Sequence, residues 1–197
     1  GEIVLLAQTD LGYTNLSKLL SKTLLDADAV HDPSCSLDDL EAHAEGLILL
    51  SGGALAGFVG APAGDGRPTL AAARADRLAA IFGDRFYIEV QRHGLGIERT
   101  AEPHLLEIAD RLNLPLVATN DCRFEDAAMS QPHDTLVCIG TGRKFSETNR
   151  PRFSPEHYFK NAAQMSELFE DIPEAISNTL VIAKRCSTMA RQRDPIL

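Results

Sequence analysis

Short, uninterrupted apolar runs recur along the chain and alternate with longer segments of helical periodicity. A run that is apolar at every position is typical of a strand buried on both faces. Ile3–Ala7 is such a run, and three further short and mainly apolar runs predict strands at Leu47–Leu50, Phe86–Val90 and Leu116–Thr119. The pattern between and after them predicts helices.

The predicted helices follow from apolar positions spaced three or four residues apart. They cover Asn15–Leu25, a short helix from Ser36 to His43, Thr69–Phe82, Glu98–Leu112, Ala127–Ile139, Pro155–Phe169 and Pro173–Arg185. Gly83 is the expected stop of the third helix. Ser154 is the expected N-cap of the sixth, with Pro155 at its first position.

Strand and helix alternate four times before a helical tail. This order predicts parallel strands joined by helical crossovers, and hence an α/β barrel or an open α/β sheet. Four strands are too few to close a barrel, so the sheet is open or further strands lie upstream of Gly1. The chain begins GEIVLLAQ without an initiating Met, and we expect it to be a piece of a longer protein.

Composition narrows the class of protein. The net charge of −9 argues against a surface that grips nucleic acid through clustered Lys and Arg. The four cysteines are scattered, which predicts reduced thiols of a cytosolic protein rather than a zinc ribbon. Residues 46–64 carry no charge, but six glycines, a serine and a proline predict a strand, a turn and a short helix there instead of a membrane span.

Candidate chemistry lies just after the predicted strands, because parallel α/β folds gather reacting groups at the strand C-termini. These positions are Gln8–Asp10, Ser51–Gly53, Gln91–His93 and Asn120–Arg123. His93 has two interpretations, a ligand for Zn²⁺, Mn²⁺ or Fe²⁺ or a simple cap of its strand. Asp121 is likewise a ligand or a turn residue.

The stretch LPLVATNDCRF carries Asp-x-Arg where two ligands could share one loop. A guanidinium does not coordinate a metal and is always charged. Arg123 is therefore expected to pair with Asp121 or another acid at this rim, as in a metal site whose chemistry has been partly removed.

Several other polar residues have two interpretations, one functional and one purely structural. His133 is a ligand or a turn residue, and Asp134 suits a helix N-terminus. Ser51–Gly53 could present backbone N–H groups to a phosphate or form an ordinary turn. The remaining histidines are expected to face solvent; they are His31, His43, His104 and His157.

Six blocks in one order carry a resemblance. They are VLLAQTDLGYTNLSKLLS, LILLSGG, FYIEVQRHG, LPLVATNDCRF, HDTLVCIGTG and the tail RPRFSPEHYFKNAAQMSELFEDIPEAISNTLVIAKRC. Because of these six blocks taken together, the chain resembles the PHP (polymerase and histidinol phosphatase) domain of bacterial replicative DNA polymerase III alpha subunits. The resemblance implies a partial, distorted (β/α)7 barrel over residues 1–145 and, over residues 146–197, a helical segment leading towards a polymerase palm.

The same resemblance assigns metal positions. His93 and Asp121 match ligand positions of the family, Arg123 stands where its last His would be, and an H-x-H motif is expected upstream of Gly1. Asn120 and His133 are weaker candidates. Versions with every ligand intact carry metal-dependent 3′–5′ exonuclease activity with Zn or Mn. Versions with replaced ligands act as a scaffold and a docking site for the proofreading exonuclease subunit ε.

For the parent protein the resemblance implies a cytoplasmic DNA-directed DNA polymerase, a nucleotidyltransferase that uses Mg. Its catalytic aspartates would lie beyond Leu197, so no residue of this chain is expected to catalyse polymerisation. Expected partners are ε, the other domains of the alpha subunit and, through those, a sliding clamp and template-primer DNA. A stand-alone PHP phosphatase fits less well, because it has no need of the FSPEHYFK tail.

Overall fold

The computed structural model describes residues 1–27 and 33–189, an α/β fold. Its strands are β1 (Val4–Ala7), β2 (Leu47–Leu50), β3 (Phe86–Val90) and β4 (Leu116–Ala118). The helices are α1 (Asp10–Asp26), α2 (Leu37–Ala42), α3 (Gly60–Gly64), α4 (Pro68–Phe82), α5 (Gly96–Leu112), α6 (Ser130–Thr141), α7 (Ala162–Leu168) and α8 (Pro173–Arg185). One-turn 3₁₀ helices are η1 (Gly83–Arg85) and η2 (Ala127–Met129).

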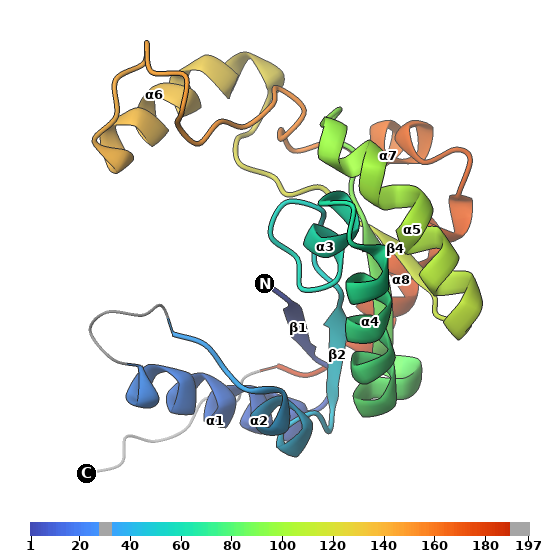
Figure 1. Ribbon diagram of the computed structural model, residues 1–197. Coiled ribbons are helices and arrows are strands. Elements are labelled where there is room, and N and C mark those ends of the chain that lie inside the picture. Colours follow the sequence, from blue (N-terminus) through green and yellow to red (C-terminus); the bar gives the residue numbers. More distant parts are fainter. Residues whose placement is uncertain (28–32, 190–197) are drawn as a thin grey trace.

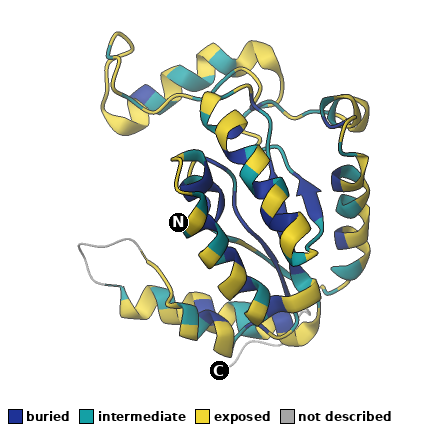
Figure 2. Ribbon diagram, turned by 45° about the vertical axis from the view of Figure 1, so that its right-hand side comes forward, coloured by how far each residue is buried: buried dark blue, intermediate teal, exposed yellow. Residues whose placement is uncertain are grey.

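Helices cover both faces of the sheet, whose strands lie in the order β1-β2-β3-β4 within the described ranges. Helices α4 and α5 pack on one face, and α8 lies against the other (Figure 1). Successive residues of β3 point to opposite faces, so Ile88 joins the core under α4 and α5 while Tyr87 packs towards Ile182 of α8. Strands β2, β3 and β4 are buried along their whole length, as predicted (Figure 2). The prediction that the run at β1 is buried on both faces is wrong, because Val4 is exposed and the other residues of β1 are half-buried.

The prediction that all strands run parallel is wrong for β1. Strands β2, β3 and β4 are parallel, but β1 pairs antiparallel with β2, and Ala7 lies opposite Leu47. The reason is a close approach between the start of α1 and the turn before β2. A Cβ on Gly12 would lie 1.8 Å from the carbonyl oxygen of Gly46. This contact brings the chain back to the end of the sheet that it has just left.

The long helix predicted to begin at Pro155 is also a wrong prediction. The helix begins at Ala162, where Asn161 accepts from the Gln164 backbone and Gln164 bonds back to the Asn161 backbone. Residues 154–160 instead run beside the loop after β4, with a parallel bridge between Phe124 and Tyr158. Ser154 does not cap a helix, because its hydroxyl donates to the His93 carbonyl oxygen.

Residues 46–64 fold as predicted, with β2 followed by a turn and the short helix α3. Among the described helices, none is long and apolar enough to cross a membrane. Ser36 caps α2 by accepting from the Asp39 backbone, which also confirms the predicted start of that helix.

Strand β1 is an edge of the sheet within the described residues, and its Val4 side chain is 41% exposed. An open edge offers backbone groups to another strand. We expect the chain to self-associate, so that its mass by light scattering rises with concentration. Val4→Lys should reduce this association, because a charge at an edge opposes strand pairing. A constant monomer mass over about a hundredfold in concentration would contradict the prediction.

Candidate functional site

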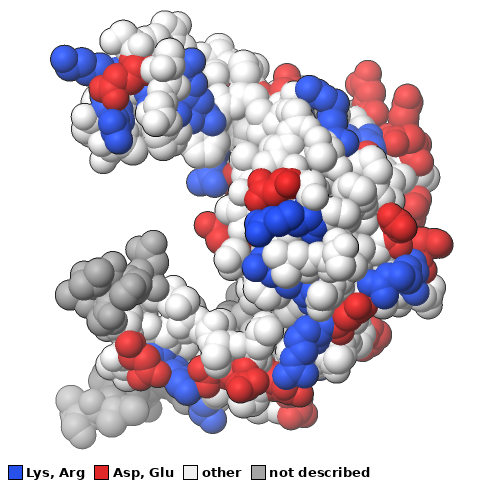
Figure 3. All heavy atoms as spheres, viewed as in Figure 1, with Lys and Arg blue, Asp and Glu red and all other residues white. Residues whose placement is uncertain are grey.

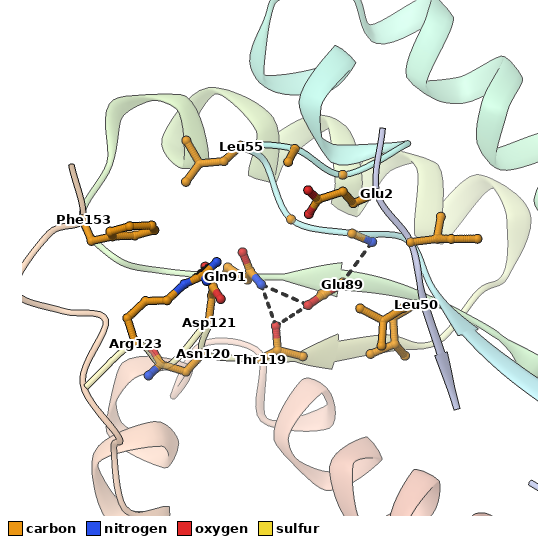
Figure 4. Close-up of a pocket in the computed structure, with 16 residues that line it drawn as sticks. Glu2, Leu50, Leu55, Glu89, Gln91, Thr119, Asn120, Asp121, Arg123 and Phe153 are labelled. Atoms are coloured by element: carbon orange, nitrogen blue, oxygen red, sulfur yellow. Dashed lines mark hydrogen bonds and ion pairs between the residues drawn. The ribbon is translucent and has the colours of Figure 1, made fainter. Parts of the chain in front are cut away.

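The C-terminal ends of β3 and β4 and the loop after β2 line a pocket of about 540 Å³. Figure 4 shows Glu89, Gln91 and Thr119 at its floor, with Asp121, Arg123 and Phe153 along one side. The parallel strands place these residues together, as the position of strand ends in α/β folds predicts. The pocket is therefore built from three of the four predicted strand-end segments.

Glu89 is the buried acid at the floor of this pocket, with 4% of its surface exposed. One carboxylate oxygen accepts from the Gly52 backbone N–H at 3.1 Å. The other accepts from Gln91 Nε2 at 3.0 Å and from the Thr119 hydroxyl. Burial raises the pKa of Glu89 above its ordinary value, although these hydrogen bonds oppose the shift. The Gly52 N–H is thus engaged inside the protein, which favours the ordinary-turn interpretation of Ser51–Gly53.

Asp121 and Arg123 form an ion pair at the pocket wall. Arg123 Nη2 and Nε lie 2.8 Å and 3.1 Å from the same Asp121 Oδ2. The guanidinium also lies over the Phe153 ring, 4.8 Å from its centroid. The sequence-based prediction that Arg123 pairs with an acid of this rim is confirmed, and the acid is Asp121.

His93 lies behind this wall and is 2% exposed. Its Nδ1 is 2.6 Å from Glu98 Oε1, and its backbone N–H donates to Glu98 Oε2 at 2.7 Å. Because a carboxylate only accepts, Nδ1 carries a proton in this hydrogen bond. Burial would raise the pKa of Glu98, but the hydrogen bonds from His93 and Leu95 outweigh it, and the pKa lies below its ordinary value.

His157 is stacked on His93, which overturns the prediction that it faces solvent. The ring centroids are 3.8 Å apart with an angle of 11° between the planes, and His157 is fully buried. Nε2 of each ring is buried without a hydrogen-bond partner among the described residues. Burial lowers the pKa of His157, and the nearby His93 adds to the effect. His43 and His104 are half-buried, and His31 lies outside the described residues.

Residues 153–160, which we call the strap, hold the loop that carries Asp121. The Arg123 N–H donates to the His157 carbonyl at 2.8 Å. Asn120 Nδ2 donates to the Tyr158 carbonyl at 2.6 Å. Lys160, whose side chain is almost fully buried, reaches Asn120 Oδ1 at 3.4 Å. Asn120 is therefore engaged by the strap.

His133 is not part of the ion pair between Asp121 and Arg123. Its ring contacts Phe124 and Phe153 at centroid distances of 5.2 Å and 5.3 Å. Neighbouring Asp134 pairs with Arg150 at 2.7 Å, and this hydrogen bond lowers the pKa of the acid. Both residues lie in α6, but Asp134 comes after the first turn, which carries no acid, so the prediction that Asp134 lies at the helix N-terminus is wrong.

The described residues do not fit a metal centre in this arrangement. Among them no group of three or more His, Cys, Asp or Glu side chains is arranged to hold an ion. Asp121 is engaged by a permanent positive charge. The two Nε2 atoms without a hydrogen-bond partner lie in nearly parallel ring planes, and so would their lone pairs. Two such lone pairs do not converge on one ion at the distance of about 2.1 Å that a Zn–N bond needs.

Residues 1–93 match the PHP domain family. These residues belong to the PHP domain family. Over 195 residues it is 46% identical to a Caulobacter vibrioides protein named DNA polymerase III subunit alpha, covering 99% of this chain and 17% of that protein. Proteins of the same name from Rickettsia bellii and Pseudomonas aeruginosa are 40% and 41% identical over 196 and 187 residues, covering 100% and 93% of this chain. The chain spans about a sixth of the length of these relatives.

Sequence reasoning missed three residues of this site. Glu89 is the one charge inside the apolar run FYIEV, and that exception was a usable signal. Glu98 opens α5 and turns back to His93, which the spacing of five residues permits but does not indicate. His157 comes to His93 from 64 positions further along the chain, and no local pattern signals it.

Proposed function

We propose that this PHP domain serves in a DNA polymerase III alpha subunit as a scaffold and as the docking site for the proofreading exonuclease subunit ε. The observation that carries the proposal is the Asp121–Arg123 ion pair. The ion pair engages the carboxylate of Asp121, which matches a metal-ligand position of the family. It also places the fixed positive charge of Arg123 where a metal cation would lie. A rim tied by ion pairs and by the strap suits a rigid support better than a reaction centre.

The proposal extends to the parent protein. The relatives carry the name of a polymerase subunit, which supports DNA-directed polymerisation with Mg by residues outside this chain, a cytoplasmic location, and a sliding clamp and template-primer DNA as partners of the whole. The division at residue 145 stays a prediction. The packing of α8 against β4 supports a tail that is firmly joined to the sheet.

The binding test uses the complete alpha subunit and purified ε. We expect a stable one-to-one complex by light scattering and calorimetry. Asp121→Ala should leave the affinity within about twofold, because the docking role needs no metal at this position. Failure of the complete subunit to bind ε under any of the salt conditions that preserve its fold would contradict the proposal.

A second candidate function is a residual metal-dependent 3′–5′ exonuclease or phosphoesterase. Its support is the arrangement of His93, whose Nδ1 is held by Glu98 while Nε2 stays free, since metal-binding histidines are oriented in this way by a carboxylate. Asp121 and His133 are the other residues in question. Zn or Mn would be the ion, with at least one ligand from outside the described residues.

Metal content separates the two candidates. Elemental analysis of the complete alpha subunit, beside Asp121→Ala, should find less than about 0.1 equivalent of Zn, Mn or Fe in both proteins if the domain is a scaffold. Stoichiometric metal that is lost in the variant would establish the second candidate instead. Metal-dependent nuclease activity that Asp121→Ala leaves unchanged would remove Asp121 from it.

A further inference from the structure

Helix α6 leaves large apolar side chains uncovered on its outer face. A surface helix normally turns its apolar stripe to the core and its polar face to water. In α6 the inward face carries His133, Asp134 and the buried Cys138, while Leu136 and Ile139 on the outer face are 66% and 72% exposed. Met129, just before the helix, is also exposed. We call Met129, Leu136 and Ile139 the α6 stripe.

This helix also receives little support from the body of the domain. Its main packing partner is η2, which directly precedes it. Figures 1 and 3 show α6 and its following loop projecting from the body, above an open hollow. The Asp134–Arg150 pair ties that loop to α6. An isolated helix of this length is only marginally stable in water, so a helix built in this way gains stability from whatever covers its apolar side.

The size of the stripe indicates the kind of occupant. A stable complex between separate proteins needs roughly 800 Å² per partner, from about 20 to 30 residues. Three apolar side chains are a small fraction of that. A segment joined to the same polypeptide needs no such area, because its effective concentration is already on the order of millimolar.

The relatives supply such a segment. This chain aligns from end to end with proteins of which it spans about a sixth, so most of a complete alpha subunit lies outside it. We propose that the α6 stripe is an intramolecular docking surface, covered in the complete alpha subunit by an apolar segment from outside residues 1–197. This proposal is independent of ε binding and of any metal.

Amide hydrogen exchange of the peptides that cover α6 tests the proposal in the complete alpha subunit. We expect slow exchange in the wild-type subunit, unchanged over a tenfold range of protein concentration and without ε. Leu136→Lys should speed exchange of these peptides about tenfold, because the charge displaces the covering segment. Ile139→Ala should give a smaller acceleration of about threefold and serves as the milder variant.

Leu180→Lys is the matched control, because Leu180 on α8 is 65% exposed and lies on a different element. It should leave exchange in α6 unchanged. Rapid exchange of α6 in the wild-type complete subunit would overturn the proposal. Slow exchange that appears only at high protein concentration would overturn it in favour of a second copy, and slow exchange that requires ε would overturn it in favour of that subunit.

Discussion

Arg92→Ala is expected to lower the free energy of unfolding by about 3 kcal/mol, through loss of a hydrogen-bonded charge pair that is largely buried. Arg92 donates to Glu102 through Nε at 2.9 Å and Nη2 at 2.6 Å. It also donates to both oxygens of Asp171 at 2.6 Å and 2.8 Å and to the Leu168 carbonyl at 2.8 Å. The guanidinium lies over the buried Phe169 ring.

These contacts join the end of β3, helix α5 and the turn between α7 and α8. Removing the guanidinium leaves the Glu102 carboxylate, itself only 22% exposed, without its counter-charge. Asp171 is 60% exposed and remains solvated when Arg92 is removed. The loss of free energy of unfolding is therefore expected to be smaller than for a group of three charged side chains that is fully buried. Urea denaturation followed by circular dichroism measures the change.

Two variants serve as controls for Arg92. Arg92→Lys keeps the charge but not the planar fork, and about half of the loss should remain. Arg77→Ala removes an exposed guanidinium that pairs with Glu41, and it should cost less than about 1 kcal/mol. A value for Arg92→Ala as small as that for Arg77→Ala would show that the three elements are held by packing alone.

Glu89→Ala is the second large expected effect, a loss of about 2 to 3 kcal/mol. The carboxylate receives three donors, from Gly52, Gln91 and Thr119. The side chains of Gln91 and Thr119 line the pocket and can turn towards water. The Gly52 backbone N–H has no such freedom, so its unmet hydrogen bond accounts for much of the loss.

Glu89→Gln tests the electrostatic part of this effect. Burial raises the pKa of Glu89 in the folded protein above its unfolded value. The folded state therefore resists ionisation, and the wild type loses stability relative to the Gln variant as the pH rises from about 4.3, the unfolded pKa, through the raised folded pKa. Below the unfolded value both proteins carry a neutral side chain, and their difference should be constant.

The measurement is a pair of pH series of the free energy of unfolding. Subtracting the two series cancels the carboxylates with lowered pKa, such as Asp171 beside Arg92, whose contribution is lost as the pH falls. The free energy of unfolding of the wild type should fall relative to that of Glu89→Gln as the pH rises. A difference between the two proteins that stays constant with pH, or that changes in favour of the wild type, would contradict the raised pKa.

The sequence by itself determined the strands and most of the helices. Periodicity is a local property, so β2 and β3 were predicted at their observed bounds, and Gly83 ends α4. The order of elements placed Asn120–Arg123 and His93 near one edge of the sheet. A guanidinium is always charged and does not coordinate a metal. The ion pair between Arg123 and Asp121 could therefore be predicted from the sequence, in which the two residues are two positions apart.

The tertiary structure decided everything that depends on distant segments. The Gly12–Gly46 approach reversed β1, and the strap replaced the start of a predicted helix with an extended segment that pairs with the loop after β4. The same strap brought His157 onto His93. Each of these contacts joins residues at least 34 positions apart, where burial and backbone hydrogen bonding with a remote partner outweigh the local preference of the sequence.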